Sequence, residues 1–407
     1  MSKRTIVSSI DVGTTKVCTV IAELNDEGAM RVVGVGITPS NGMHKGMVVN
    51  INEAKDSIRE SVRKAEQTCG YRVESAYIGV TGRHVSSLNN RGVVTITRND
   101  RMVRTDDLRR VVQSAQSIKV PNDRRLLHVI PRTYAVDGQT MVKNPVGMHG
   151  FRLDVETHVI TAAISSVQNL AKCIRGVGLD IEELVLEPLA SAEAVLTEDE
   201  KQAGVMLADI GGGTTDIAIF REGSIWHTAV LPVAGYQLTR DIAIGLGLPF
   251  DIAEQMKKQY GSVMPVYESK MDTPNTMVGN GHRASYQDLC DILRARVEEV
   301  LRLILLELPQ SEHNMIIPAG LVLTGGSSNL SGIDVLGRDI LHIPVRVGTP
   351  VNIQGISDAL HDPAYATVVG LLLWGVRQQG RLSRKPRGFF GLGIRRLVTQ
   401  LAGLLRR

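Results

Sequence analysis

The sequence predicts an α/β fold of two similar lobes, with a small α+β subdomain inserted in the first lobe and an amphipathic helix at the C-terminus. Two segments about half the chain apart, 7–24 and 205–223, follow the same order of apolar run, aspartate, glycine-containing turn, two threonines and apolar run. Between them, residues 83–163 read as strand, helix starting at a Thr-Asp cap, strand and strand. Residues 389–407 place aliphatic side chains on one helical face and arginines on the other.

Length and charge support this division. A chain of 407 residues exceeds one ordinary domain, and 43% hydrophobic residues suffice for a normal core. The net charge of +4 conceals an asymmetry, because residues 375–407 contain nine basic residues and no acidic one. Residues 1–374 therefore carry a net charge of about −5 by the same formal count, so no long basic surface for nucleic acid is expected there.

Other classes of protein are disfavoured by what the sequence lacks. The four cysteines stand far apart, without the spacing of a zinc site or a disulfide framework. The N-terminus has no apolar core of a signal peptide, and no run of 18 apolar residues predicts a membrane-spanning helix. We therefore expect a cytoplasmic body with a basic amphipathic end.

Each of the two repeated segments is predicted to form a hairpin, because apolar runs bounded by glycine favour strands. Glycine lacks a Cβ atom and permits positive φ, so backbone N–H groups in such a turn can approach phosphate oxygens closely. Threonine hydroxyls and one lysine add donors at the same place. The predicted phosphate-binding residues are Gly13, Thr14, Thr15 and Lys16 in the first turn and Gly211, Gly212, Gly213, Thr214 and Thr215 in the second.

Aspartates accompany both turns. Asp11, Asp209 and Asp216 suit a hydrated Mg²⁺, which prefers oxygen ligands and keeps several of its waters. We expect Asp11 and Asp209 to hold Mg²⁺ through water. A single turn of this kind could equally be a tight hairpin without a ligand. Two copies, each with an aspartate just before the glycine, favour a nucleotide site.

Three further segments complete a family resemblance. "AGLVLTGGSSNLSGI" (319–333) is an apolar strand that ends in Gly325, Gly326 and Ser327, while "LEPLASAEAVL" (186–196) and "ATVVGLLLWG" (366–375) read as helices with small residues for close crossing. With the two hairpins, these segments resemble in order the actin-like nucleotide-binding superfamily.

That resemblance implies two lobes with ATP clamped between opposed hairpins. It places Gly325, Gly326 and Ser327 against the adenosine, and Glu187, at the start of the first connecting helix, where a catalytic residue orients the attacking water. A buried glutamate that caps the helix is the alternative.

The position of the inserted module and the basic C-terminal helix is similar to the FtsA family of bacterial cell-division proteins. The match extends through "HVIPRTYAVDG", "PVGMHGFRLDVETHVITA" and "AGYQLTRDIAIGLGLPFDIAEQMKKQYG". It implies an adaptor that binds ATP, assembles head-to-tail into actin-like filaments and hydrolyses ATP slowly at most. It also implies tethering of FtsZ filaments to the inner face of the cytoplasmic membrane at the division site, with recruitment of later division proteins.

By the same resemblance, Glu254, Lys257 and Lys258 approach the ribose and adenine, and Arg294 and Arg296 contact the FtsZ C-terminal peptide. The alternatives are a solvated helix face for the first three residues and surface ion pairs for the two arginines. Two other functions remain open. One is an FtsA-like scaffold of pilus assembly, and the other is a small-molecule kinase of the superfamily, for which we locate no catalytic aspartate.

The C-terminal helix is predicted to lie on anionic lipid, its aliphatic face in the headgroup–acyl boundary and its arginines toward the headgroups. Docking of this helix on the protein's own core or in a partner's groove is the alternative. The predicted membrane-contacting residues are Phe390, Ile394, Arg395, Arg396, Leu397, Val398, Leu401, Leu404, Leu405 and Arg406.

These assignments define the expected domains. The first lobe has its core in 1–82 and 164–196, to which 365–375 returns, and its inserted subdomain in 83–163. The second lobe has its core in 197–230 and 301–364, and its small subdomain, with the FtsZ-peptide site, in 231–300. A flexible basic linker, 376–388, then leads to the membrane helix, 389–407.

Overall fold

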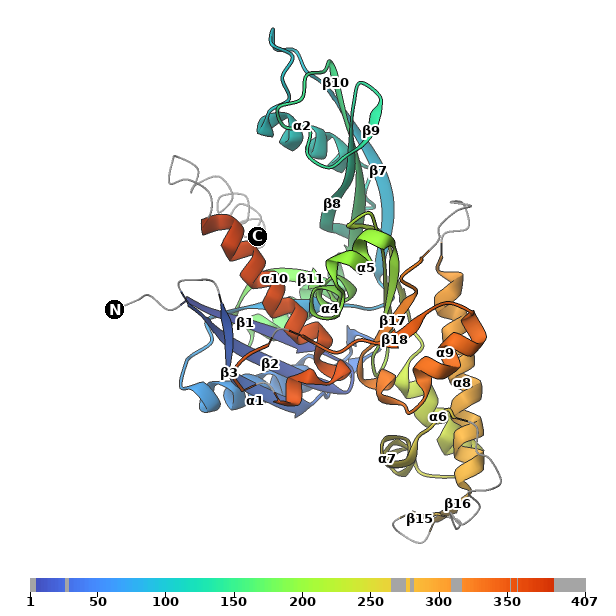
Figure 1. Ribbon diagram of the computed structural model, residues 1–407. Coiled ribbons are helices and arrows are strands. Elements are labelled where there is room, and N and C mark those ends of the chain that lie inside the picture. The colour runs from blue at the N-terminus through green and yellow to red at the C-terminus, as the bar shows by residue number, and fades with distance from the viewer. Residues whose placement is uncertain are drawn as a thin grey trace.

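The computed structural model of the protein describes residues 5–25, 29–264, 276–278, 282–308, 317–351, 353–356 and 358–383. Two five-stranded mixed sheets form the cores of two lobes, and a four-stranded sheet forms a subdomain that projects from the first lobe (Figure 1). The predicted two-lobe α/β architecture with an inserted α+β subdomain is therefore confirmed. The amphipathic helix expected at 389–407 lies outside the described residues.

The first-lobe sheet has the strand order β11-β6-β1-β2-β3. Its first three strands along the chain are antiparallel neighbours, while β6 and β11 run parallel to β1. Helices α1 and α3 pack on one face and α10 packs on the other. The bounds are β1 Thr5–Val12, β2 Lys16–Leu24, β3 Met30–Pro39, β6 Ser75–Val80, β11 Asp180–Leu186, α1 Ile51–Cys69 and α3 Ile164–Arg175.

The second-lobe sheet, β14-β13-β12-β17-β18, repeats this topology of three antiparallel strands followed by two parallel ones. Helices α6, α8 and α9 cover one face, and α4 packs against β12 and β13 from the other. The bounds are β12 Val205–Ile210, β13 Thr215–Arg221, β14 Ser224–Leu231, β17 Leu321–Thr324, β18 Val345–Val347, α5 Glu198–Ala203 and α9 Ile333–Leu341. The sequence repeat thus corresponds to a structural repeat.

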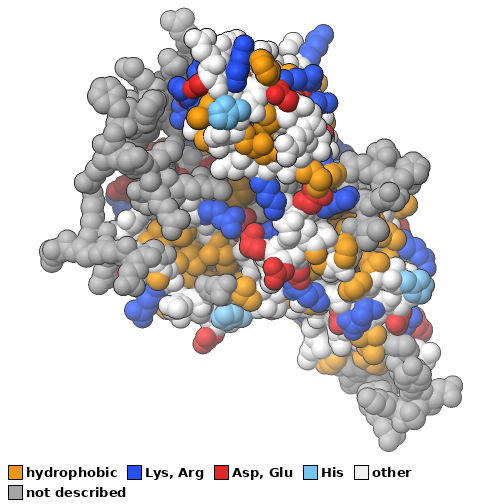
Figure 2. All heavy atoms as spheres, turned by 45° about the horizontal axis from the view of Figure 1, so that its top comes forward, with side chains coloured by type: hydrophobic (Ala, Val, Ile, Leu, Met, Phe, Trp, Pro, Cys, Tyr) orange, Lys and Arg blue, Asp and Glu red, His pale blue; other side chains and the backbone are white. Residues whose placement is uncertain are grey.

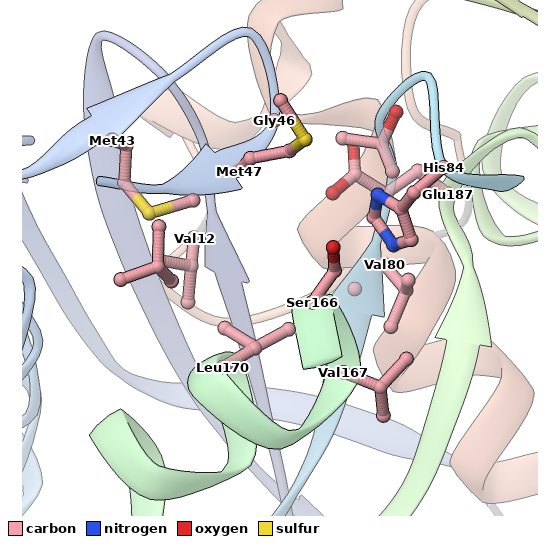
Figure 3. A pocket seen from close by; sticks show the side chains of 13 residues that line it. Val12, Met43, Gly46, Met47, Val80, His84, Ser166, Val167, Leu170 and Glu187 are labelled. Atoms are coloured by element: carbon pink, nitrogen blue, oxygen red, sulfur yellow. The ribbon is translucent and has the colours of Figure 1, made fainter. Parts of the chain in front are cut away.

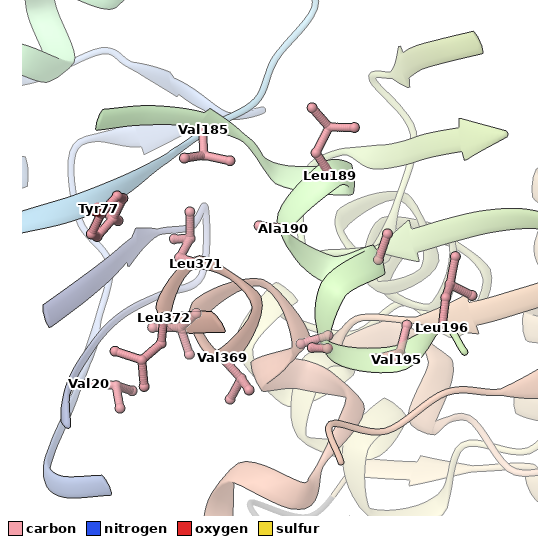
Figure 4. Close-up of a cluster of buried hydrophobic side chains, with 14 of the residues drawn as sticks. Val20, Tyr77, Val185, Leu189, Ala190, Val195, Leu196, Val369, Leu371 and Leu372 are labelled. Carbon is pink, nitrogen blue, oxygen red and sulfur yellow. The ribbon is translucent and has the colours of Figure 1, made fainter. Parts of the chain in front are cut away.

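Helices α4 (Glu187–Val195) and α10 (Ala366–Ser383) cross between the lobes, as the sequence predicted. Their backbones touch, since a Cβ atom built on Gly370 would lie 1.8 Å from the carbonyl oxygen of Ala190. Figure 4 shows Leu371 and Leu372 of α10 on the side of Val20, Tyr77 and Val185, with Leu189 of α4 in the same buried cluster. Only glycine at position 370 permits so close an approach.

Helix α10 corrects the predicted linker. It continues to Ser383, so residues 376–383 of the expected flexible segment are helical. Arg377 explains part of this extension because its guanidinium pairs with Glu193 of α4 at 2.8 Å. Within the part of the chain that the structure describes, no helix is both long and apolar enough to cross a bilayer.

The inserted subdomain has the strand order β7-β10-β8-β9, with α2 against β7 and β10. The sequence predicted strand, helix, strand and strand, and missed the short β9. The expected Thr-Asp cap of the helix is one residue off, since the N-cap is Arg104, whose N–H donates to Asp107 at 2.9 Å. The bounds are β7 Val85–Thr95, α2 Thr105–Gln116, β8 Arg124–Val136, β9 Gln139–Val142 and β10 Arg152–Ala163.

The small subdomain of the second lobe contains α6 (Gly235–Gly245), α7 (Phe250–Tyr260) and α8 (Tyr286–Leu306), with a short pair β15 (Thr276–Val278) and β16 (His282–Ala284). Helix α8 passes the expected boundary at residue 300.

Figure 2 shows basic and acidic side chains interspersed over the face with the inserted subdomain, without an extended basic surface on its described part.

Candidate functional site

The two glycine-containing turns face each other across the lobes. A Cβ atom on Gly212 would lie 2.4 Å from Cγ2 of Thr15, and one on Gly213 would lie 3.0 Å from Cα of Lys45. None of Gly13, Gly211, Gly212 and Gly213 has a positive φ, contrary to our expectation. Gly212 and Gly213 are required here because the loops approach closely, since a side chain at either position would collide with the first lobe. A Cβ atom on Gly13 would instead lie 2.9 Å from the carbonyl oxygen of Lys16 in its own turn.

Four carboxylates are buried between the turns and the first connecting helix. Asp11 lies near the end of β1, Asp209 and Asp216 face each other across β12 and β13, and Glu187 opens α4. Burial raises the pKa of Asp11 to about 6 and that of Asp216 to about 7. Burial, and then the charges of Asp11, Asp216 and Asp209, raise the pKa of Glu187 well above its usual value.

This arrangement suits a hydrated cation. Within the described ranges, no three His, Cys, Asp or Glu side chains converge closely enough to ligate a metal directly. Carboxylate oxygens are groups to which Mg²⁺ binds directly or through its waters. That Asp11 and Asp209 hold such an ion stays a prediction.

Asp209 connects the second lobe to both crossing helices. Its Oδ2 atom accepts hydrogen bonds from Ser191 of α4 at 2.6 Å and from Thr367 of α10 at 3.0 Å. Thr81 likewise donates to Asp216. Sequence reasoning missed these three hydroxyls. The one available signal was that Ser191 lies one helical turn after Glu187 and shares its face.

The threonines and Lys16 have more varied surroundings than predicted. The hydroxyl of Thr215 is committed to the carbonyl of Val233 at 2.7 Å, so this residue does not offer its proton to a ligand. Lys16 donates to the carbonyl of Ala364, and its Nζ lies 3.9 Å from the centre of the Tyr365 ring. Its charge still lowers the pKa of Asp11, against the larger effect of burial.

The residues expected near the adenosine do gather beside the second turn. Ser327 donates to the carbonyl of Gly211 at 2.9 Å. Lys257 donates to the carbonyl of Gly235 at 3.1 Å and pairs with Glu254 at 2.7 Å. Lys258 pairs with the same carboxylate, but its side chain is 72% exposed, so it lies on the solvent side of this cluster.

Gly325 marks the close approach of this segment to the carboxylates. It adopts a φ of +85°, and a Cβ atom there would lie 2.3 Å from Oδ1 of Asp209. A side chain at this position is therefore excluded by both conformation and space. The predicted adenosine segment and the predicted magnesium-binding aspartate thus form one continuous site.

A small pocket adjoins Glu187 (Figure 3). Glu187, Thr81, His84 and Ser166 supply its polar lining, with apolar side chains that include Val12. It has room for about one water molecule. The ring nitrogens of His84 are buried without a hydrogen-bond partner, and burial lowers the pKa of this histidine. A water here would lie beside the carboxylate expected to orient it.

The predicted partner site is less distinctive. Arg296 of α8 pairs with Asp241 and Glu299, each at 2.5 Å, and Arg294 pairs with Glu298 at 3.3 Å. Both arginines are thus engaged in ion pairs on the helix surface. Their contact with a peptide stays a prediction, as do the lipid contacts of residues 390–406, which lie outside the described residues.

The raised carboxylate pKa values predict how stability depends on pH. Because a folded-state pKa of about 7 for Asp216 exceeds its unfolded value of 3.8, the folded state binds more protons between these values, and stability falls as pH rises through this window. We expect the free energy of unfolding of Asp216→Asn, measured relative to that of the wild type, to rise by about 2 kcal/mol as the pH rises from 5.5 to 8. Urea denaturation of both proteins without nucleotide or Mg²⁺ measures this difference. If the two unfolding free energies differed by the same amount at both pH values, the prediction would be wrong.

Comparisons with known proteins agree with this geometry. The family model for Cell division protein FtsA matches residues 206–370, and that for the SHS2 domain inserted in FtsA matches residues 82–161. Cell division protein FtsA of Pseudomonas aeruginosa is 43% identical over 92% of this chain and 90% of its own length. The chain belongs to the FtsA family of cell division proteins. FtsA of Escherichia coli K12 is 34% identical over 98% of both chains.

Solved structures show the same actin-like fold at much lower identity. A PilM–PilN type IV pilus biogenesis complex matches with a TM-score of 0.67 and 19% identity over 91% of this chain and 98% of that chain. MreB5 of Spiroplasma citri bound to ADP matches with a TM-score of 0.56 and 13% identity over 93% of this chain and 98% of that chain. Since the FtsA relatives are far more similar in sequence, the pilus scaffold resembles this protein in fold alone.

Proposed function

We propose that this FtsA-family protein is an ATP-binding adaptor of cell division that carries FtsZ filaments on the inner face of the cytoplasmic membrane. The observation that carries the first step is the pair of glycine turns closing over four buried carboxylates. Ionised carboxylates buried together in such a place are costly without a cation. A magnesium–nucleotide complex supplies both the positive charge and the phosphate oxygens that the turns can receive.

In this proposal, backbone N–H groups of the two turns contact the phosphates, and Asp11 and Asp209 hold the water shell of Mg²⁺. The ion supplies positive charge between the carboxylates and the phosphates. Gly325 and Ser327, with Lys257, lie where the adenosine would bind. Glu187 orients a water in the adjoining pocket, so hydrolysis is possible in principle and is expected to be slow.

The adaptor role needs four further contacts. Head-to-tail association of the nucleotide-bound lobes would form filaments, the second-lobe small subdomain would bind the FtsZ C-terminal peptide, and later division proteins would be recruited to the assembly. The basic amphipathic segment 389–407 would bind anionic lipid reversibly, and filament formation would strengthen that binding through multivalency. Membership of the FtsA family supports this set of contacts.

Co-sedimentation with anionic liposomes tests the membrane step. We expect the full chain to pellet, more so with ATP, and a chain ending at Ser383 to stay in the supernatant. Ser383 is the suitable end point because α10 continues to that residue. Within the full chain, Leu401→Glu should abolish pelleting, whereas Thr399→Glu, with the same charge on the polar face, should reduce it only a few-fold. Equal pelleting of the shortened chain would refute the anchor.

A further inference from the structure

The hairpin formed by β4 (Met43–His44) and β5 (Met47–Val48) belongs to the first lobe but touches the second. Its central residue Lys45 has a φ of +47°, and its Cα lies against Gly213. The N–H of Gly46 donates to Oγ1 of Thr14 in the first turn at 3.2 Å. The hairpin therefore contacts both of the turns that we expect to hold phosphate.

Aromatic contacts link the hairpin to the second lobe. The ring of His44 meets the edge of Tyr236 at the start of α6, with centroids 6.0 Å apart. The ring of Tyr236 in turn packs on that of Phe250 of α7, with centroids 5.2 Å apart. The backbone N–H of Tyr236 donates to the carbonyl of Gly212 at 2.7 Å. The second turn is thus held between α6 and a hairpin of the opposite lobe.

The two ends of the second turn have different neighbours. Its first glycine, Gly211, bonds to Ser327 and Gly235 on the side expected for the adenosine. Its third glycine, Gly213, lies against Lys45. A nucleotide that follows the turn from its adenosine end would consequently present its last phosphate toward Lys45.

Lys45 is available for such a contact. It forms no hydrogen bond or ion pair with any other residue that the structure describes, and its side chain is only half-buried. Met43 and Met47 line the pocket of Figure 3 together with Val12 and Leu170, and methionine side chains can repack if the hairpin shifts. A lysine without a partner among the described residues, on such a hairpin, suits recognition of a phosphate.

We propose that Lys45 contacts the terminal phosphate of a nucleoside triphosphate and that the hairpin 43–48 thereby distinguishes ATP from ADP. This inference rests on the proposed ATP binding at the same site. Lys45 acts by binding and positioning, and the contact between His44 and Tyr236 holds the hairpin against the second lobe.

The test measures the dissociation constants of Mg²⁺·ATP and Mg²⁺·ADP by equilibrium dialysis with the full chain. We expect Lys45→Gln to weaken ATP binding about tenfold and ADP binding less than twofold. Lys119→Gln, which removes the same charge from an exposed position in the inserted subdomain, should leave both affinities unchanged. Equal ATP affinity in the wild type and Lys45→Gln would overturn the inference and leave ATP binding intact. A wild type that binds no ATP would instead remove the proposed function.

A second measurement needs no variant. Hydrogen exchange of the wild-type chain should show stronger protection of the backbone amides of residues 43–48 with Mg²⁺·ATP than with Mg²⁺·ADP. Equal protection by the two nucleotides, while each is bound, would show that the hairpin does not respond to the terminal phosphate and would overturn the proposal even if Lys45→Gln failed to fold.

Discussion

Replacing Gly370 by alanine is expected to lower the free energy of unfolding by about 3 kcal/mol. The new Cβ atom would lie 1.8 Å from the carbonyl oxygen of Ala190 and 2.3 Å from its carbonyl carbon. Because these are backbone atoms of α4, no side-chain rotation can relieve the overlap, and the two helices must move apart. Leu189, Leu371 and Leu372 would then lose contacts in the cluster of Figure 4.

Thermal denaturation of this 407-residue chain should show the loss as a midpoint about 3–4 °C lower. Gly326→Ala is the matched control for stability alone, since Gly326 lies in the expected adenosine segment; its Cβ atom would meet only Cβ of Ala364, at an ordinary 3.6 Å. The first variant should also bind ATP less well, since α4 carries Glu187 and Ser191 into the site. A midpoint for Gly370→Ala within 2 °C of the control would mean that the crossing is looser than the structure shows.

The parts of the site that the sequence predicted are those made by neighbouring residues. Asp11 and Gly13, or Asp209 and Gly211, lie in one turn, so their chemistry can be judged from their spacing. Their repetition half a chain apart indicated two lobes. Glu187 and Lys257 were assigned from the family resemblance alone, because nothing local distinguishes a site glutamate from a helix-capping one.

Other contacts could not be predicted because they join distant segments. Ser191, Thr367 and Asp209 meet only once both helices have crossed and the second sheet has formed. The contact between Lys45 and Gly213 depends on how far the lobes close. The continuation of α10 into the linker-like stretch "VRQQGRLSRKPRG" is supported at its beginning by the pairing of Arg377 with Glu193, which joins segments far apart in the sequence.

Substituting Asp209 by asparagine is expected to abolish magnesium-dependent ATP binding while leaving the free protein at least as stable as the wild type. Burial raises the pKa of Asp209, against the lowering effect of its hydrogen bonds from Ser191 and Thr367, so its ionised form is disfavoured where it stands. Asparagine retains an oxygen that accepts these hydrogen bonds and removes the negative charge. It therefore relieves the repulsion with Asp11 and Asp216.

The affinity for Mg²⁺·ATP should fall, although the free protein is not destabilised. Without the carboxylate, one of the two groups expected to hold the water shell of Mg²⁺ is lost, and we expect Mg²⁺·ATP to bind at least about 100-fold more weakly. Equilibrium dialysis with and without Mg²⁺, together with urea denaturation of the free protein, measures both effects in one variant.

Asp209→Ala separates the charge from the hydrogen bonds. Alanine leaves the hydroxyls of Ser191 and Thr367 without their acceptor, so this variant should lose about 1–3 kcal/mol of stability as well as ATP binding. If Asp209→Asn bound Mg²⁺·ATP as tightly as the wild type, the carboxylate would not serve the ion. If the wild type bound ATP equally well with and without Mg²⁺, the buried carboxylates would need another explanation. A stable Asp209→Asn protein that no longer binds the complex would instead show that the buried charge is retained for the ligand at the expense of the fold.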